Sequence, residues 1–393
     1  MENVNMLDSE IPVIDISQVG VHQTQASDPT LRHHGGAQQI PGYDEGLLAS
    51  KLNAAFRRSG FIYLKNHGLD TLYEELHVAA EAFFAQPHRA KEKVAAKSYG
   101  DPGFCGMGME AVSTTFGLQV ENLCSAPEDA EAAGSKQAAD PVESLEDGYD
   151  PDFWRTVYPD RYGRSGDESQ SGRHKNLHEL ALQLRNALCE KVLLKLLDLC
   201  SIALQLPSRD FLRKKFFEKG AGANCMRLAH YVNVNDKNGV GVNEGEPKAA
   251  STDKEPNISY GEHTDYDGLT FLWRSRSNGL QVRLGDSQGE HRWVDIPVPS
   301  DDAHCLVVNV GDLFQRWTHD YWRSSVHRVL YKHFDGHHRY SFVYFTGPHG
   351  DTLIDELPSP LFPKCEIGSS RKRKYQAVTA SEHIRLKIEA SQV

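Results

Sequence analysis

The sequence predicts an α+β fold in which helices surround an antiparallel β-sandwich or β-barrel. Apolar residues recur at helical spacing in the N-terminal half, around residues 47–56, 72–84 and 177–206. From Met226 onward the pattern changes to short apolar runs separated by turn residues. Hydrophobic residues make up 39% of the 393-residue chain and charged residues 25%, which is ordinary for a protein with a buried core. We expect one compact unit rather than two independent domains.

The N-terminal half is predicted to alternate strands and helices. Residues 11–16 (IPVIDI) form the first predicted strand. The helix over 47–56 ends before Gly60, and residues 60–68 (GFIYLKNHG) give a second strand that closes in a turn. Helical spacing returns over 72–84 and stops before Pro87.

Polar stretches interrupt this pattern. Residues 125–150 are rich in Ala, Glu, Asp, Ser and Gly, which predicts a surface insertion or a disordered loop, and 235–257 form a second polar loop. Residues 177–206 are dense in leucine up to Pro207, so we expect a long helix packed on one face of a sheet. The predicted divisions are an N-terminal region (1–125), a polar insertion and linker (126–175), a helical support (176–225), a β-rich core (226–350) and a C-terminal extension (351–393).

The C-terminal half contains seven strand candidates. Short strands at fairly even spacing are typical of a sandwich or barrel. The runs are MRLAHYVNV, LTFLW, GLQVRL, RWVDIPV, CLVVNVGDLF, SSVHRVLY and RYSFVYFT.

Charge and hydropathy exclude several classes of partner. The formal net charge of −11 argues against a nucleic-acid or anionic-membrane surface, and no stretch is long and apolar enough to span a membrane. The basic run at 369–375 is either a nuclear-import signal or, more commonly, a solvated tail. The first residues lack a signal-peptide pattern, and the seven cysteines are odd in number without a C-x-x-C pair. We therefore expect a cytoplasmic protein without a disulfide framework or a thiolate zinc site.

One short motif points to chemistry. His263 and Asp265 stand two residues apart beside the run LTFLW, and on a strand this spacing places both on one face. The pair is either a hydrogen-bonded polar contact at a strand end or two ligands of a metal. A third ligand is available in SSVHRVLY, where His327 is predicted to lie on a strand.

Other histidines are weaker candidates for the third ligand. His333 and Asp335 repeat the His-x-Asp pattern, but a turn follows directly, and the histidines beyond it lie outside apolar strands. His304 opens a strand and His319 lies in a predicted loop, so both rank below His327. Two histidines and one carboxylate leave adjacent positions open and suit Fe(II) in oxygenases, whereas zinc more often has three ligands and one water.

A second constellation lies on the strand RYSFVYFT. Arg339, Ser341, Val343 and Phe345 share one of its faces. An inward guanidinium is costly unless it meets an anion, so Arg339 either pairs with an acidic residue at a barrel mouth or binds an anionic ligand. Beside a ferrous site, Arg339 and Ser341 would hold the distal carboxylate of 2-oxoglutarate. Tyr231 would donate a further hydrogen bond from an adjacent strand.

At this point the chain resembles the isopenicillin N synthase-like Fe(II)/2-oxoglutarate dioxygenases. The resemblance runs from Ile11 to about Pro348 and departs from the family at Val232, where a proline is frequent, and in longer insertions. The motifs occur in family order: IPVIDI, GFIYLKNHG, RLAHY, HTDYDGLTFL, GLQVR, WVDIPV, VVNVGDLFQRWT, SSVHRVL and RYSFVYF.

The resemblance implies a double-stranded β-helix (jelly-roll) core in residues 226–350, preceded by a non-haem dioxygenase N-terminal region. It implies Fe(II), 2-oxoglutarate as cosubstrate and O2, with ascorbate as a further candidate cofactor. The residues that match the family's metal ligands are His263, Asp265 and His327, and those that match its 2-oxoglutarate site are Arg339, Ser341 and Tyr231.

The expected activity is oxidation of a small organic metabolite by hydroxylation, desaturation or ring closure, with release of succinate and CO2. An oxidase of the same fold that uses no 2-oxoglutarate is the main alternative, because such enzymes share the Arg-x-Ser motif, and a catalytically silent binding module is a weaker one. We expect a monomer. Residues that either line the substrate pocket or belong to the core are Phe104, Met107, Met109, Trp317 and Phe345.

Overall fold

A computed structural model describes most of the predicted elements. The described residues are 11–20, 44–96, 103–106, 120–124, 177–220, 222–232, 258–285, 289–302, 304–330, 338–362 and 374–391. The predicted insertions at 125–150 and 235–257 lie outside them, as do His333 and Asp335.

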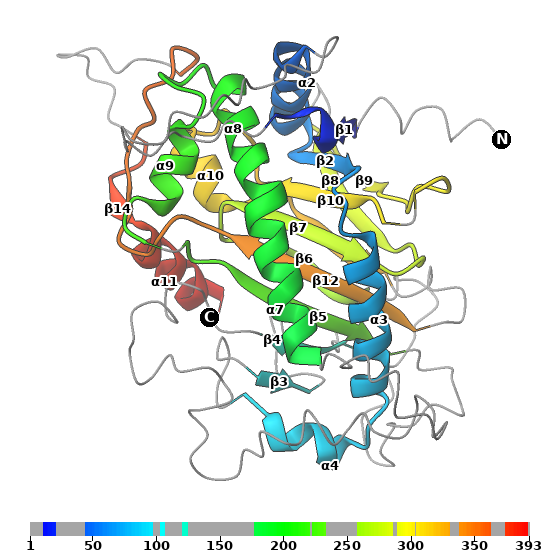
Figure 1. Ribbon diagram of the computed structural model, residues 1–393. Coiled ribbons are helices and arrows are strands. Elements are labelled where there is room, and N and C mark those ends of the chain that lie inside the picture. Colours follow the sequence, from blue (N-terminus) through cyan, green and yellow to red (C-terminus); the bar gives the residue numbers. More distant parts are fainter. Residues whose placement is uncertain are drawn as a thin grey trace, which may run out of the picture.

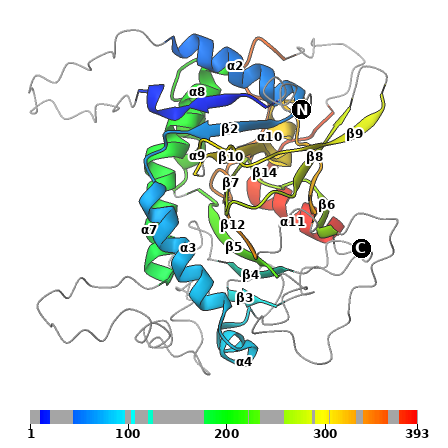
Figure 2. The same ribbon diagram turned by 90° about the vertical axis from the view of Figure 1, so that its right-hand side faces the viewer.

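The described core consists of two facing β-sheets, with helices over the outer face of the larger one (Figures 1 and 2). Sheets packed in this way bury the side chains of their inner faces against each other. The larger sheet has the order β1 (Val13–Asp15), β2 (Phe61–Lys65), β10 (Leu306–Val310), β7 (Leu269–Arg274), β12 (Arg339–Thr346), β5 (Cys225–Tyr231), β4 (Val120–Cys124) and β3 (Gly103–Cys105). The smaller has the order β6 (Ile258–His263), β11 (His327–Leu330), β8 (Leu280–Gly285) and β9 (His291–Asp295).

The long leucine-rich helix was predicted and is present, although it ends at Ala203 rather than at 206. It consists of α7 (Leu177–Leu188), a π-helical turn (Cys189–Leu193) and α8 (Leu194–Ala203), and it crosses the large sheet in Figure 1. The other helices are α2 (Glu45–Arg58), α3 (Asp70–Phe84), α4 (His88–Lys91), α9 (Phe211–Phe217), α10 (Asp312–Trp317) and α11 (Ala380–Ser391). Strands β13 (Leu353–Ile354) and β14 (Val378–Thr379) pair just before α11.

Alternation along β12 separates two cores. Tyr340, Phe342 and Tyr344 face the helices and belong to the larger cluster of buried apolar residues. The intervening residues line a cavity between the two sheets, so the predicted face of Arg339, Ser341, Val343 and Phe345 is confirmed.

The structure differs from the predicted arrangement at three points. The run CLVVNVGDLF is strand only over β10, because Gly311 breaks it and α10 begins at Asp312. His263 is the last residue of β6, whereas Asp265 lies in the turn before β7, so the prediction that both share one strand was wrong. The N-terminal half also supplies β1 to β4 to the large sheet and does not only surround it.

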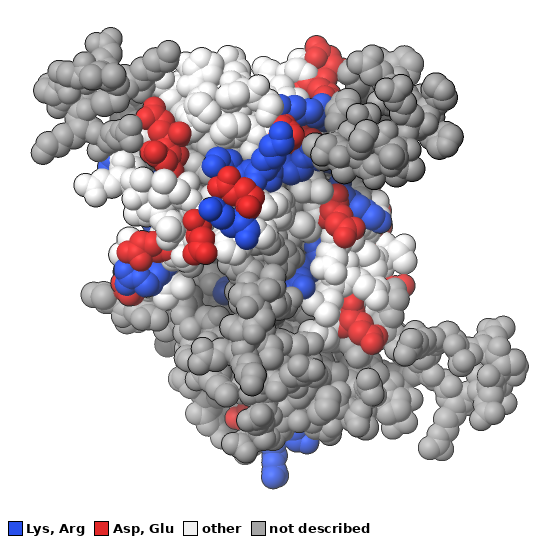
Figure 3. Space-filling model, turned by 60° about the vertical axis from the view of Figure 1, so that its left-hand side comes forward, with Lys and Arg blue, Asp and Glu red and all other residues white. Residues whose placement is uncertain are grey.

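Among the described residues, no helix combines the length and apolar character needed to cross a bilayer. On the face shown in Figure 3, the described acidic and basic side chains are interspersed. Around α8 and α9, for example, Arg209 contacts Glu45 and Asp198, and Arg213 contacts Asp198.

Candidate active site

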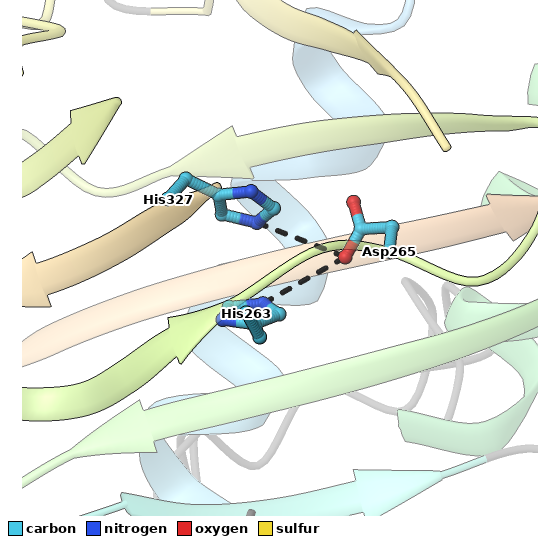
Figure 4. A group of neighbouring side chains, drawn as sticks. All are labelled: His263, Asp265 and His327. Carbon is cyan, nitrogen blue, oxygen red and sulfur yellow. Dashed lines mark ion pairs between the residues drawn. The ribbon is translucent and has the colours of Figure 1, made fainter. Parts of the chain in front are cut away.

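Three predicted ligands converge at one end of the inter-sheet cavity. One potential ligand atom from each of His263, Asp265 and His327 lies within 4.8 Å of the other two, and the described residues contain no second such group of His, Cys, Asp and Glu. The Nε2 atoms of His263 and His327 each lie 3.7 Å from Oδ1 of Asp265 (Figure 4). The two nitrogens and one carboxylate oxygen therefore face a common point, as a metal site requires.

Strand pairing sets the positions of the two histidines. His263 ends β6 and His327 begins β11, and the two residues are direct partners in the antiparallel ladder. Their rings are 4.2 Å apart between centroids. The backbone N–H of Asp312 donates to the Asp265 carbonyl at 2.8 Å, which fixes the turn that carries the carboxylate.

Backbone carbonyls orient both imidazoles. Nδ1 of His263 lies 2.9 Å from the Gly261 carbonyl oxygen, and Nδ1 of His327 lies 3.1 Å from that of Ser325. Because a carbonyl oxygen only accepts, each Nδ1 carries the proton and each Nε2 keeps its lone pair for a ligand. Outer hydrogen bonds of this kind are usual at metal-binding histidines.

The electrostatics of the group favour the protonation states that bind a cation. Burial, together with the neighbouring His327, lowers the pKa of His263 to about 3. Burial opposes ionisation of Asp265, but the two imidazoles and the Asn309 amide outweigh it and lower the pKa of this carboxyl. A neutral imidazole and an ionised carboxylate are the forms that coordinate metals, so the donor set fits a divalent ion.

The rival histidines lie away from this group. His304 pairs with Glu74 at 3.2 Å between Nε2 and Oε1. His319 follows α10, with its ring 6.4 Å from that of Phe362. Neither residue belongs to the group formed by His263, Asp265 and His327.

The predicted clamp residues line the same cavity. Arg339 on β12 is the direct ladder partner of Tyr231 on β5, and its guanidinium carbon lies 4.4 Å from the centroid of the Tyr231 ring. Arg339 is 1% exposed, and burial lowers the pKa of its guanidinium against the opposing effect of Tyr231. Ser341 is equally buried, and its hydroxyl has no hydrogen-bond partner in the described structure. A buried hydroxyl beside an arginine fits an anionic ligand.

The apolar pocket candidates divide between two locations. Phe345 lines the cavity, whereas Phe104 and Trp317 belong to the cluster on the helical side of the large sheet. Met107 and Met109 lie outside the described residues.

Five polar residues of the cavity were missed by the sequence analysis: Asn122, Arg227, Tyr260, Thr270 and Asn309. A polar residue inside the apolar run of β10 was an available signal for Asn309. Asn122 had none, because strand β4 itself was not predicted.

Two family models match the chain in succession. The N-terminal model for non-haem dioxygenases in morphine synthesis matches residues 11–124, and the 2OG-Fe(II) oxygenase superfamily model matches 224–348. The second match contains all six predicted site residues.

Curated relatives align over most of the chain. The 2-oxoglutarate-dependent dioxygenase frbA of Dothideomycetidae sp. (strain 11243) is 28% identical, over 84% of this chain and 87% of that protein. Homoarginine-6-hydroxylase 2-ODD-C23 of Glycine max is 25% identical, over 97% and 96%.

Solved structures share the fold. A full-length Neurospora crassa protein, solved in complex with alpha-KG and thymine, has a TM-score of 0.62 at 21% identity, over 97% of both chains. The rice dioxygenase for auxin oxidation has a TM-score of 0.57 at 20% identity, over 97% and 96%. These similarities confirm the predicted jelly-roll core flanked by helices.

The family models and curated relatives agree on the class of enzyme and on its cofactors, Fe(II) and 2-oxoglutarate. With the grouped histidines and carboxylate in one cavity, they confirm the expected oxidoreductase. The chain belongs to the Fe(II)- and 2-oxoglutarate-dependent oxygenases.

Proposed function

We propose that the protein oxidises a small organic metabolite at an iron held by His263, Asp265 and His327. The observation that carries this proposal is the convergence of the two Nε2 atoms on Oδ1 of Asp265 inside a cavity. When bound, Fe(II) with 2-oxoglutarate supplies the activation of O2 that oxidises an organic substrate and releases succinate and CO2.

We assign the distal carboxylate of 2-oxoglutarate to Arg339, Ser341 and Tyr231. The guanidinium and the buried hydroxyl stand two residues apart on one face of β12, so both can donate to one carboxylate. The ring of Tyr231 supports the guanidinium from the neighbouring strand. This arrangement fixes the cosubstrate at the end remote from its reacting carbons.

The remaining cavity wall suits a small substrate. Leu272, Leu280, Val329, Val343 and Phe345 supply apolar surface around the polar groups. Apolar surface of this kind excludes water, and the polar groups beside it can orient a substrate through specific hydrogen bonds. Curated relatives carry names such as homoarginine-6-hydroxylase and proline hydroxylase, which supports a small organic substrate here.

We also propose a cytoplasmic monomer that acts without nucleic acid or membrane, with ascorbate as a reductant that maintains Fe(II). None of the cysteines in the described residues forms a disulfide, which supports a reducing compartment. The net charge of −11 supports the absence of a nucleic-acid partner. We further propose that the chain divides into regions after residues 125, 175, 225 and 350, as the sequence predicts.

Anaerobic titration with Fe(II) tests the metal assignment. The wild type should bind one iron, and His263→Ala and His327→Ala should each lose it while keeping the wild-type circular dichroism spectrum. His304→Ala is the matched control, because its imidazole contacts Glu74 outside the site. Near-normal iron affinity in either ligand variant would overturn the assignment.

Product counting tests the reaction. With a substrate found by screening metabolites for stimulated 2-oxoglutarate turnover, succinate and CO2 should form in equal amounts with the oxidised product. Consumption of O2 and substrate without succinate would instead support the oxidase of the same fold.

A further inference from the structure

The side chain of Asn122 presents an unsatisfied amide to the active-site cavity. Asn122 lies on β4, is 1% exposed and lines the cavity that contains the metal group. Neither its Oδ1 nor its Nδ2 has a hydrogen-bond partner in the described structure. Buried amides in native proteins are nearly always paired, so two unpaired atoms facing a cavity indicate a ligand that supplies both a donor and an acceptor.

This amide is too far from the clamp to share its carboxylate. Asn122 pairs with Ala229 on β5, and Ala229 pairs with Ser341 on β12. Two strand spacings amount to roughly 10 Å, so a ligand group at Asn122 differs from the carboxylate held at Ser341. The methyl group of Ala229 between them leaves room on the cavity floor. Asn122 therefore faces the space beside the cosubstrate.

Arg227 stands next to this position. It lies two residues before Ala229 on β5 and lines the same cavity. Diagonal neighbours on adjacent strands are roughly 7–8 Å apart, which one small ring can span. The Nη1 of Arg227 donates to the Tyr260 hydroxyl at 3.3 Å, and the Tyr260 ring packs edge-on to His263 at 4.7 Å between centroids. Arg227 therefore contacts Tyr260, which in turn contacts the ring of His263.

Charge in the cavity favours an electron-rich group at Arg227. Among the described residues that line the cavity, Arg227 carries a positive charge. Its guanidinium has five N–H donors and no acceptor, so a substrate oxygen can bind it in addition to Tyr260.

We infer that Asn122 and Arg227 form the recognition subsite for the primary substrate, and that this substrate carries a cyclic amide edge. Asn122 holds a ring N–H and the adjacent carbonyl, and Arg227 binds a second carbonyl, as a cyclic imide or ureide offers. The inference rests on the proposed function, because it places the substrate beside 2-oxoglutarate and iron.

Binding of small probes tests the subsite without turnover. The protein is loaded anaerobically with Fe(II) and 2-oxoglutarate, and the change of its charge-transfer absorbance is followed during titration with uracil or succinimide. The matched controls are 1,3-dimethyluracil and N-methylsuccinimide, because they retain the carbonyls but lack every ring N–H. The wild type should bind the unmethylated compounds and discriminate against the methylated ones by about tenfold or more.

Substitutions assign the discrimination to the two residues. Asn122→Leu keeps the branching of the side chain at Cγ but removes both polar atoms, so it should lose about tenfold in affinity for uracil and the preference over the methylated compound. Arg227→Met should lower the affinity for both uracil and the methylated compound. Arg227→Lys should lower these affinities less, because it keeps the positive charge. Asn278→Ala is the control, since this exposed amide accepts from Val298 outside the cavity.

Thermal unfolding separates recognition from a structural role. Removal of an unsatisfied buried amide leaves stability unchanged or improves it, so Asn122→Leu should not lower the melting temperature. A lowered melting temperature with unchanged probe affinity would overturn the subsite. Failure of the wild type to bind any of these cyclic amides, with normal iron and 2-oxoglutarate binding, would overturn the substrate class. Failure to bind 2-oxoglutarate itself would instead contradict the proposed function.

Discussion

The Asn309 amide donates a hydrogen bond of 2.6 Å from Nδ2 to Oδ2 of Asp265. The two histidines approach the other carboxylate oxygen, because both Nε2 atoms lie 3.7 Å from Oδ1. Asn309 is 3% exposed on β10, directly opposite Thr270 on β7. The contact leaves Oδ1 directed at the point where the two imidazoles meet, and it stabilises the ionised carboxyl.

Asn309→Ala should therefore weaken iron binding without unfolding the protein. Loss of such an outer hydrogen bond typically lowers metal affinity by about 10- to 100-fold. Anaerobic Fe(II) titration measures the effect, and Asn278→Ala is the matched control at an exposed amide. Unchanged iron affinity in Asn309→Ala would show that the turn alone orients Asp265.

Two residues of the C-terminal helix α11 contact Asp312 and the turn that carries Asp265. The Nζ atom of Lys387 lies 2.6 Å from Oδ2 of Asp312. The same oxygen accepts a hydrogen bond of 2.9 Å from the Thr264 hydroxyl. His383, which is 4% exposed, places its Nε2 3.1 Å from the Tyr266 carbonyl oxygen. Both contacts lead to residues adjacent to Asp265 in the chain.

Lys387→Met should reduce iron affinity a few-fold, because Asp312 then loses the cation that supports its position beside the turn. The magnitude is modest since the lysine is partly exposed and its ion pair is screened. Arg385→Ala is the control on the same helix, because Arg385 pairs only with the neighbouring Glu382 and Glu389 in the described structure. An equal loss in both variants would indicate general weakening of α11 instead.

Arg339→Ala should lower 2-oxoglutarate affinity without changing iron affinity. Removal of one partner of a buried ion pair typically costs about 2–5 kcal/mol, which is roughly 30- to several-thousand-fold in affinity. Arg339→Lys should lose less, because it keeps the charge but not the two-pronged donor. Calorimetric titration of the Mn(II)-loaded protein measures both, with Arg57→Ala on the surface of α2 as control. Wild-type affinity in Arg339→Ala would place the clamp elsewhere.

The sequence was most informative where one strand carries the whole signal. Arg339 and Ser341 were placed on one face because β12 is regular and side chains alternate along it. For His263 and Asp265 the conclusion that they lie together was right but its reason was wrong. Asp265 lies in a turn after the end of β6, so the turn, and not the alternation of side chains along a strand, brings its carboxylate to the histidines.

Contacts between distant segments could not be predicted in this way. Asn122 enters the cavity because β4 pairs with β5, more than 100 residues later in the chain, and no local periodicity encodes that pairing. The contact of Lys387 with Asp312 likewise joins α11 to α10 with no pattern in either segment alone. Such tertiary pairings depend on the shape of the complete core.

A buried ionic cluster on the helical side of the large sheet gives the protein a predicted acid sensitivity. Lys91 is 2% exposed, and its Nζ lies 2.7 Å from both carboxylate oxygens of Glu121. His230 places Nδ1 3.3 Å from Glu121 and Nε2 2.8 Å from Nδ1 of His338. The titrating side chains of Glu121 and His230 are therefore buried together with the ammonium group of Lys91.

Both pKa shifts have the same consequence for stability. Burial opposes ionisation of Glu121, but His230 and Lys91 outweigh it, so the pKa of this carboxyl lies below 4.5. Burial also holds the pKa of His230 below 6.5, against the opposing effect of Glu121. In each case the unfolded chain binds a proton more readily than the folded one. Stability should therefore fall as the pH drops below 6.5 through His230, and again below 4.5 through Glu121.

Glu121→Gln should destabilise the fold at neutral pH by about 3–5 kcal/mol, because the Lys91 ammonium stays buried without its counter-charge. The difference from wild type should shrink as the pH falls below 4.5, where the native carboxyl is itself protonated. Urea unfolding at a series of pH values measures both effects, with Glu92→Gln as control at an exposed carboxylate paired only with His88 in the described structure. Lys91→Met combined with Glu121→Leu should recover most of the loss, since it removes both buried charges. A double variant as unstable as Glu121→Gln would show that packing around Glu121, and not the unpaired ammonium, causes the loss.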